Sequence, residues 1–360
     1  MTDTQHLFLH GSIAKALLKL GIPIILINIL QSAYQLTDAF WVGRLGADQV
    51  AAVSVSMPVT FLVIAIGSGL AMAGAILSAQ YMGAGLQDKV NHVAAQTMLM
   101  VTVTATVLGL IGYFLSPYFL VLLGVEQAVY GDALKFMHVS FIGVVFVFIY
   151  AMFQALMRGI GQTKIPLIIV SGTVLLNFAL DPLLIFGWGR FSGFGVMGAA
   201  LATLITQSLA ALIGVWVFLR GRHGIQLKLS SFKPDWQYMK QAFLLGAPGS
   251  VELSARAFGL IIMSFLVASF GTYTLASYGV GSNILQMVMI PAMGLSMAVS
   301  TLVGQNMGAG NPKRAAQITR LACIWGLTGL SLVGGVAYLF AEYLVAFFIP
   351  DDPSVIKGGA

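Results

Sequence analysis

Long apolar stretches separated by short polar connections run along the whole chain. Each is about 20 residues long or more, which is the length a helix needs to cross a bilayer core of about 30 Å. The pattern predicts nine spanning helices, at residues 17–41, 50–79, 93–116, 136–157, 165–187, 196–219, 241–267, 275–304 and 318–348. The chain is therefore expected to be an all-α polytopic membrane protein whose surroundings are the lipid bilayer.

The same pattern occurs twice along the chain. Residues 67–85 and 292–310 are identical at ten of nineteen positions, including Gln80 and Gln305, and the same offset also holds upstream. A fixed internal period, here about 225 residues, marks a duplicated unit. Since the first unit holds six spans, an even number, we expect two parallel six-helix bundle lobes related by an axis along the membrane normal.

The period also sets the expected domain organisation. Residues 1–222 are predicted to form an N-terminal lobe, 223–240 a cytoplasmic interlobe linker, and 241–360 a C-terminal lobe truncated to three helices. A completed second repeat predicts a natural protein of about 450 residues with about twelve helices. We therefore expect about 90 residues, the tenth to twelfth helices, to be missing from this sequence. Whether the 360-residue chain transports anything by itself stays open.

The distribution of charge predicts the orientation. Only 8% of the residues are charged, and the mean hydropathy is +0.92. Of the 18 Lys and Arg residues, thirteen lie on the side of the N-terminus, one (Arg256) lies inside a span, and the other side holds Arg44, Lys135, Arg190 and Lys357. The positive-inside rule then predicts a cytoplasmic N-terminus in the cell inner (plasma) membrane. We expect no nucleic-acid partner, because no clustered basic surface with a binding motif occurs.

The motifs of most enzymes and pumps do not occur in the sequence. Cys323 is the single cysteine, so a disulfide or zinc framework is excluded. The five His residues are scattered, and neither a GxxxxGK[ST] phosphate loop nor a GxSxG elbow occurs. We predict a protein without catalytic residues or cofactor, which is neither an enzyme nor by itself an ATP-driven pump.

Polar side chains recur at one depth in three of the predicted spans. Asp38 has Tyr34 one turn away in the first span, Asn177 and Asp181 share a face of the fifth, and Thr203 lies early in the sixth. An acid at the centre of a spanning helix costs about 2.5–3.5 kcal/mol, so it usually faces a partner or a cavity. The spacing predicts a buried network whose two carboxylates share a proton, or whose oxygens, with those of Asn177 and Thr203, hold Na⁺. The alternative is that these groups only join helices through hydrogen bonds.

Prolines are expected to bend several spans. Pro23 and its repeat mate Pro248 each remove a backbone hydrogen bond from a spanning helix. Such kinks would serve a bending mechanism, or they are static. Asp181-Pro182 is also typical of a helix break near the interface, where a charge is less costly.

Other intramembrane polar residues suggest further sites. Gln31 and Gln35 follow the stripe of the first span, and Gln154 lies on a face of the fourth, so we predict that all three line a substrate cavity. Glu252 and Arg256 lie four residues apart in the seventh span, where they form either a second site or a local ion pair.

An ordered set of motifs gives the chain a family resemblance. The motifs are LGIP at 20–23, LTDAFWVGRLG at 36–46, AQYMGAG at 79–85, QALMRGIGQTKIP at 154–166, NFALDP at 177–182, GVMGAALAT at 195–203 and GQNMGAGNPKRA at 304–315. With the repeat, this set resembles the multidrug and toxic compound extrusion (MATE) family, in particular the DinF-like branch that couples through its N-terminal lobe. The resemblance implies two six-helix lobes around a central cavity and exchange of organic cations for H⁺ or Na⁺ by alternating access.

The resemblance also implies roles for particular residues. The coupling network of that branch falls on Asp38, Asp181, Asn177, Tyr34 and Thr203. The proline proposed to bend the first helix falls on Pro23. Another branch uses acids in the seventh and tenth helices, and Glu252 lies near the first of these positions.

The sequence thus predicts a monomeric secondary antiporter that exports small organic cations or amphipathic drugs, without a cofactor and with H⁺ or Na⁺ as coupling ion. One alternative is a lipid-linked oligosaccharide flippase of similar architecture, which would need several basic side chains in its cavity, whereas only Arg256 lies deep in a span. Another is a membrane enzyme, which the scattered histidines disfavour. The substrate, the ion and the resting conformation are not predicted.

Overall fold

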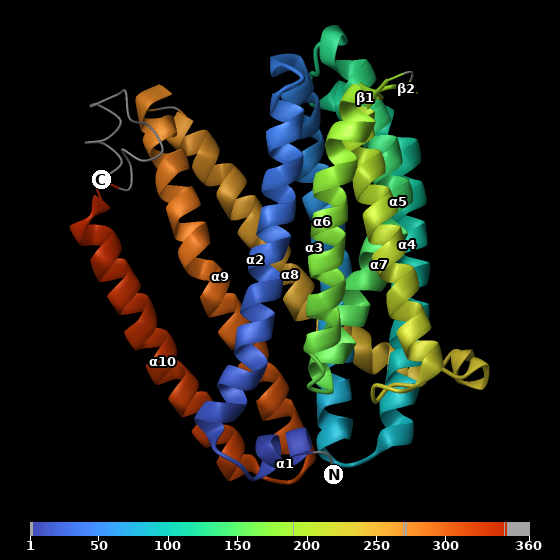
Figure 1. Ribbon diagram of the computed structural model, residues 1–360, viewed down its shortest axis with the longest axis vertical. Coiled ribbons are helices and arrows are strands. Elements are labelled where there is room, and N and C mark those ends of the chain that lie inside the picture. The colour runs from blue at the N-terminus through green and yellow to red at the C-terminus, as the bar shows by residue number, and fades with distance from the viewer. Residues whose placement is uncertain (1–2, 190, 269, 271, 342, 344–360) are drawn as a thin grey trace.

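The computed structural model describes residues 3–341 and 343, apart from 190, 269 and 271. Its described elements are almost entirely helical (Figure 1). They are α1 (Asp3–Leu9), α2 (Ile13–Gly43), α3 (Ala47–Gly83), α4 (Gln87–Leu122), α5 (Gln127–Gly159), α6 (Lys164–Phe186), β1 (Gly187–Trp188), β2 (Phe191–Ser192), α7 (Val196–Arg220), the 3₁₀ helix η1 (Leu229–Phe232), α8 (Trp236–Ala268), α9 (Thr272–Gly308) and α10 (Pro312–Leu339).

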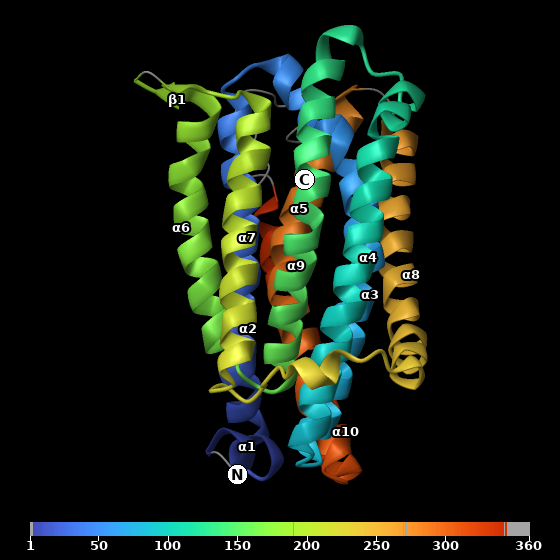
Figure 2. The same ribbon diagram turned by 90° about the vertical axis from the view of Figure 1, so that its right-hand side faces the viewer.

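The all-α polytopic class predicted from the apolar pattern is confirmed. Within the described residues, eight helices have segments long and apolar enough to cross a membrane, namely α2 to α7, α9 and α10. The seventh predicted span, 241–267, corresponds to α8, which is not among these eight and lies beside α3 (Figure 2). Most helices extend past the predicted spans, because polar end turns continue a helix outside the apolar core of the bilayer.

Several details differ from the expectations. The last span ends at Leu339 instead of residue 348, and residues 342 and 344–348 lie outside the described part, as do Arg190 and Lys357. The sequence pattern missed α1 and the β1–β2 hairpin, since both are too short to give an apolar period.

The predicted helix break at Asp181-Pro182 is wrong. The helix α6 continues through Pro182 to Phe186, with Asp181 fully buried. Proline is tolerated inside a membrane helix where neighbouring groups satisfy the freed backbone.

The helix α8 begins at Trp236, a few residues before the predicted span at 241–267. The Asp235 carboxylate accepts hydrogen bonds from the backbone N–H groups of Gln237 and Tyr238, and this capping starts the helix at that point.

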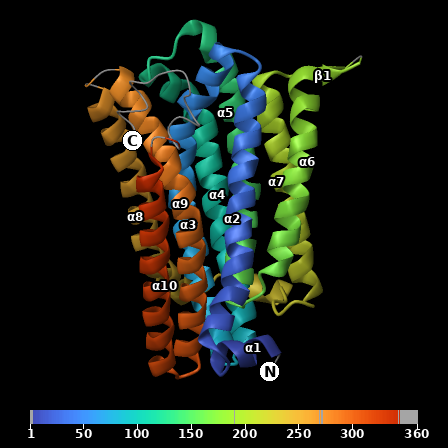
Figure 3. The same ribbon diagram turned by 60° about the vertical axis from the view of Figure 1, so that its left-hand side comes forward.

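The helices form two groups. The N-terminal group, α2 to α7, shares a large core in which α5 packs against α3, α4 and α7, and α6 lies between α2 and α7. The C-terminal group, α8 to α10, lies against α2 and α3 (Figure 3). After α7, the chain crosses α4 through η1 on its way to α8 (Figure 2).

The contacts between the groups are reciprocal with respect to the predicted 225-residue repeat. The helix α3 packs against α8, α2 packs against α9, and α3 also crosses α9. A Cβ on Gly83 would overlap the carbonyl oxygen of Gln305, and a Cβ on Gly308 would overlap that of Gln80. Because the two glycines are repeat mates, as are the two glutamines, the contact has the reciprocity of a two-fold relation.

Candidate functional site

The predicted intramembrane network is assembled where α2, α6 and α7 meet. On α2, Tyr34 and Asp38 lie one turn apart. On α6, Asn177 and Asp181 also lie four residues apart, so each pair occupies one helix face. Thr203 follows near the start of α7. The structure therefore brings together the five residues predicted as the coupling network.

Hydrogen bonds connect these residues within and between helices. Thr203 Oγ1 donates to Asp38 Oδ2 at 3.1 Å, which joins α7 to α2. Asn177 Nδ2 donates to Asp181 Oδ1 at 3.1 Å along α6. The carboxyl groups of Asp38 and Asp181 also lie close enough to interact with each other. Two acids from different helices thus form one pair.

The network contains acceptor atoms that no described donor reaches. Asp38 Oδ1, Asp181 Oδ2 and Asn177 Oδ1 are all buried and have no hydrogen-bond partner among the described residues. Asn177 and Asp181 are fully buried side chains. A buried polar group without a partner costs free energy, and the cost is larger for a charged group. Three such acceptors in one network therefore favour a cation or an added proton.

The same oxygen atoms limit the kind of metal that the site suits. The described residues contain no group of three or more His, Cys, Asp or Glu side chains that would hold a metal. Two carboxylates and one amide oxygen instead match the oxygen preference of hard cations. The oxygen atoms of the predicted Na⁺ ligands Asp38, Asp181 and Asn177 therefore fit such an ion. The fourth predicted ligand, Thr203, donates its hydroxyl hydrogen to Asp38 in this structure.

Two further residues belong to this site: Thr206, which the sequence places in a polar cluster with Thr203, and Trp41, which the sequence prediction missed. Thr206 is fully buried, and its hydroxyl lies 2.5 Å from that of Tyr34. Trp41 lies one turn beyond Asp38, its ring packs edge-on against those of Phe178 and Phe186, and its buried Nε1 has no described partner. The sequence signal for both is their spacing: Thr206 follows Thr203 by three residues and Trp41 follows Asp38 by three, and residues three apart share a helix face.

The other predicted site residues lie outside this network. Gln31 Nε2 donates to Gln154 Oε1 at 3.3 Å, between α2 and α5, while Gln35 is exposed. Glu252 and Arg256 form an exposed pair at 3.1 Å on α8, which packs against α3.

Pro23 lies inside α2, and the helix runs without interruption from Ile13 to Gly43. The structure thus places this proline about four turns of helix before Asp38 on the same element. A change in the bend of α2 at Pro23 would move Asp38 relative to α6 and α7.

Known proteins resemble the chain in sequence and in fold. The family model MatE matches residues 23–183 and 248–359, and the two matched segments begin at the repeat mates Pro23 and Pro248. The probable multidrug resistance protein YpnP of Bacillus subtilis (strain 168) is 29% identical over 98% of this chain and 78% of its own length. The probable multidrug resistance protein YoeA of the same organism is 30% identical over 93% of this chain and 73% of its own length. A crystal structure of a MATE protein in the bent conformation has a TM-score of 0.91 at 22% identity, covering 99% of this chain and 79% of that one, and so shares the fold.

Proposed function

Because this chain belongs to the MatE family of multi-pass membrane transporters, which are not enzymes, we propose that it exports cationic or amphipathic organic compounds in exchange for H⁺ or Na⁺. The named relatives are multidrug resistance proteins, which supports a drug-like cargo. The flippase alternative is not favoured, since these relatives are named for drug resistance.

The observation that carries the proposal is the set of three buried acceptors around Asp38 and Asp181. A proton shared between Asp38 Oδ1 and Asp181 Oδ2 would remove one negative charge and the largest part of the desolvation cost. A Na⁺ ion at the same place would engage Asn177 Oδ1 as well. Either cation changes the charge at the junction of α2, α6 and α7.

Coupling then follows from competition between the organic cation and the coupling cation, and from movement of the helices that carry the site. The site holds the coupling cation in one conformation, and an organic cation competes for the same negative charge in the other. Since the Asp38 side chain is held by Thr203 on α7, a change of charge at Asp38 alters the contact between α2 and α7. We infer that a bend at Pro23 transmits this change along α2, as the resemblance to the N-lobe-coupled branch implies.

The remaining expectations complete the proposal. The transporter lies in the inner membrane as a monomer, with the α1 end in the cytoplasm, as the charge distribution indicates. Gln31 and Gln154 form part of the wall that the substrate passes. We assign Glu252 and Arg256 no part in coupling, because they pair with each other on the surface of α8.

The test is efflux of a fluorescent cationic dye from proteoliposomes, with a pH gradient and a Na⁺ gradient imposed separately. Wild type is expected to move dye under one of the two gradients, and Asp38→Asn and Asp181→Asn to lose this movement. The matched control is Asp48→Asn, which neutralises an exposed acid at the start of α3. Full efflux in Asp38→Asn, or none in wild type under either gradient, would overturn the proposal.

A further inference from the structure

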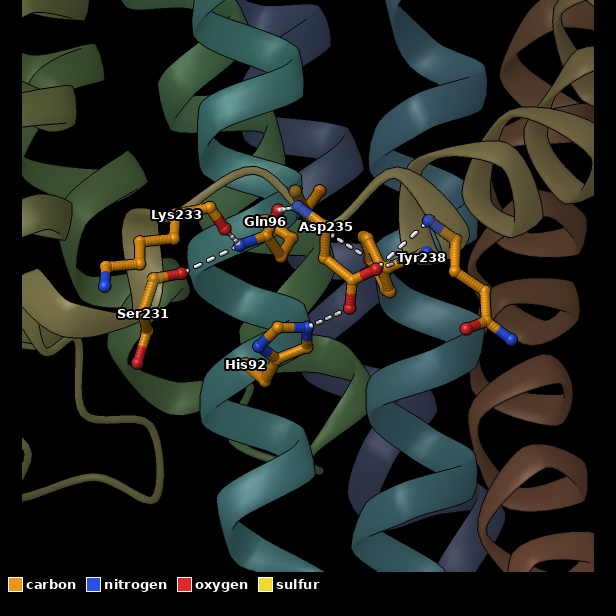
Figure 4. A network of polar contacts seen from close by, with 8 residues as sticks. His92, Gln96, Ser231, Lys233, Asp235 and Tyr238 are labelled. Carbon is orange, nitrogen blue, oxygen red and sulfur yellow. Dashed lines mark hydrogen bonds and ion pairs between the residues drawn. The ribbon is translucent and has the colours of Figure 1, made fainter.

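A buried glutamine on α4 holds the chain segment that leads into α8. Gln96 Nε2 donates to the carbonyl oxygens of Ser231 at 2.8 Å and Lys233 at 2.7 Å, and Gln96 Oε1 accepts from the backbone N–H of Asp235 at 3.0 Å. Gln96 is fully buried, so all three bonds are shielded from water. In Figure 4, dashed lines join the Gln96 side-chain amide to both carbonyl oxygens.

The same face of α4 also holds α8 itself. The hydroxyl groups of Thr97 and Tyr238 lie 2.7 Å apart, and both side chains are buried. His92 Nε2 lies 2.9 Å from Asp235 Oδ2, and the other carboxylate oxygen of Asp235 caps α8 (Figure 4). We call these contacts of His92, Gln96 and Thr97 with residues 231–238 the linker clamp. It fixes the first turn of the C-terminal group to the N-terminal group.

A second set of contacts holds the segment that leads into α2. Arg314, on α10, donates from Nε to the carbonyl oxygen of Phe8 at 3.3 Å and from Nη2 to that of Gly11 at 2.6 Å. Asn306, on α9, is fully buried and donates to the same Phe8 carbonyl at 3.2 Å. We call these contacts the N-terminal clamp. It fixes the start of the N-terminal group to the C-terminal group.

The two clamps are counterparts within the repeat. Phe8 and Lys233, whose carbonyl groups are held, occupy equivalent positions in the two units, and α10 lies at the position of α4 in the second unit. Each clamp therefore ties the third long helix of one group to the chain entering the first long helix of the other. The donors on α4 and α10 differ, a neutral amide on Gln96 and a guanidinium on Arg314, and in the N-terminal clamp the amide of Asn306 on α9 donates as well.

The clamps flank the closest approach between the groups. The carbonyl contacts of Gly83 and Gly308 lie at this end of α3 and α9, and Gln305 Nε2 donates to the Gly159 carbonyl of α5 at 2.9 Å. In Figures 1 and 3, α9 and α10 approach α2 at the end where α1 lies, and Figure 1 shows them diverging toward the other end. The structure is therefore closed at the α1 end.

We propose that the linker clamp and the N-terminal clamp form a paired lock, which must release before the two helix groups can separate at the α1 end. The physical reason is the short reach of these bonds. Donor–acceptor distances beyond about 3.5 Å no longer make a hydrogen bond, so a displacement of about 1 Å between α4 and α8 breaks the linker clamp. The consequence for transport rests on the proposed alternating-access function, whereas the lock itself does not.

The first test measures separation directly. Spin labels on Lys164→Cys and Arg320→Cys, exposed positions in the two groups, report the distance between them by pulsed electron paramagnetic resonance in nanodiscs, with Cys323→Ser as background. Gln96→Leu and Asn306→Leu are expected to raise the fraction of molecules with a longer distance. Each net hydrogen bond lost corresponds to about a fivefold rise, or about 1 kcal/mol.

The matched control removes an equivalent bond within one group. Gln87, also on α4, donates its side-chain amide to the Gly224 carbonyl in the loop after α7 at 2.5 Å. Gln87→Leu should leave the distance distribution as in wild type. An unchanged distribution in Gln96→Leu and Asn306→Leu, or an equal change in Gln87→Leu, would overturn the lock.

The second test asks whether release is needed for transport. A short bifunctional thiol reagent joining His92→Cys to Asp235→Cys should stop dye efflux, and cleavage of the bridge should restore it. Joining Asn91→Cys to Gln226→Cys, a contact between α4 and the loop after α7, is the control that should permit efflux. Undiminished efflux with the first bridge in place would contradict the lock. Absence of efflux before bridging would count against the proposed function, and the distance measurement would still decide the lock.

Discussion

Single residues at the junction of α2, α6 and α7 form the proposed coupling network. Asp38 is fixed by Thr203, and Asp181 by Asn177, so each acid keeps one oxygen atom without a described donor. Tyr34 is fixed by Thr206 and stands beside the acids without bonding to them in this structure. Thr206 therefore positions α2 against α7 without carrying charge.

Thr206→Val should lower the thermal stability of the purified protein. It leaves the buried Tyr34 hydroxyl without its partner, at a cost of about 1–3 kcal/mol. Thr206→Ser keeps the hydroxyl and should retain most of the stability. The measurement is the midpoint of thermal unfolding in detergent. Equal midpoints for the Val and Ser variants would contradict this assignment.

The charge of Asp235 is predicted to stabilise the fold over a defined range of pH. The backbone N–H of Tyr238 and the side chain of His92 bind the carboxylate and hold the pKa of Asp235 below its ordinary value of 3.8. A carboxyl group whose pKa is lowered in the folded state stabilises the fold at any pH above its ordinary pKa. This stabilisation is lost as the pH falls through the lowered pKa.

Asp235→Asn should therefore lower the unfolding midpoint both at pH 6 and at pH 8. The difference from wild type should shrink below about pH 4, where the wild-type carboxylate takes up a proton. Thermal unfolding across this range tests the prediction. A difference that vanished at pH 6, or that persisted unchanged in acid, would show that the charge of Asp235 is not responsible.

At the scale of helices, close approach of α3 and α9 depends on glycine. Gly83→Ala would place a methyl group on the Gln305 carbonyl and force the two helices apart. We expect a loss of stability of about 1–3 kcal/mol, as for other overpacked sites. Gly172→Ala is the control, because nothing lies within 4 Å of an added methyl group there, and alanine favours the helix. A Gly83→Ala variant as stable as Gly172→Ala would contradict the packing described here.

The helices themselves were predictable, because apolar length and a 3.6-residue period suffice to find a spanning helix and its polar face. The pairs Tyr34–Asp38 and Asn177–Asp181 followed from that period alone. The period within one helix does not show which other helices it contacts. The sequence therefore does not predict the bond between Tyr34 and Thr206 or the contacts of Gln96 with the linker. The local rule that proline ends a helix also gave the wrong result at Pro182, through which α6 continues.

At the scale of the whole molecule, the coupling network and the paired lock lie in different places. The acids occupy the N-terminal group, whereas the lock joins the two groups at the α1 end. The helix α2 connects them, since its first residues follow the N-terminal clamp and its last turns carry Asp38. A change of charge at Asp38 that bends α2 would thus reach the lock through one element.

The most direct test of the account is to measure cation release on ligand binding by the purified protein. Addition of a cationic dye in weakly buffered, Na⁺-free solution should release about one proton per bound ligand if H⁺ couples. Repetition with Na⁺ and a Na⁺-selective electrode covers the other case. The double variant Asp38→Asn/Asp181→Asn should release neither cation when the dye is added. Equal release by wild type and the double variant would show that these carboxylates do not couple transport.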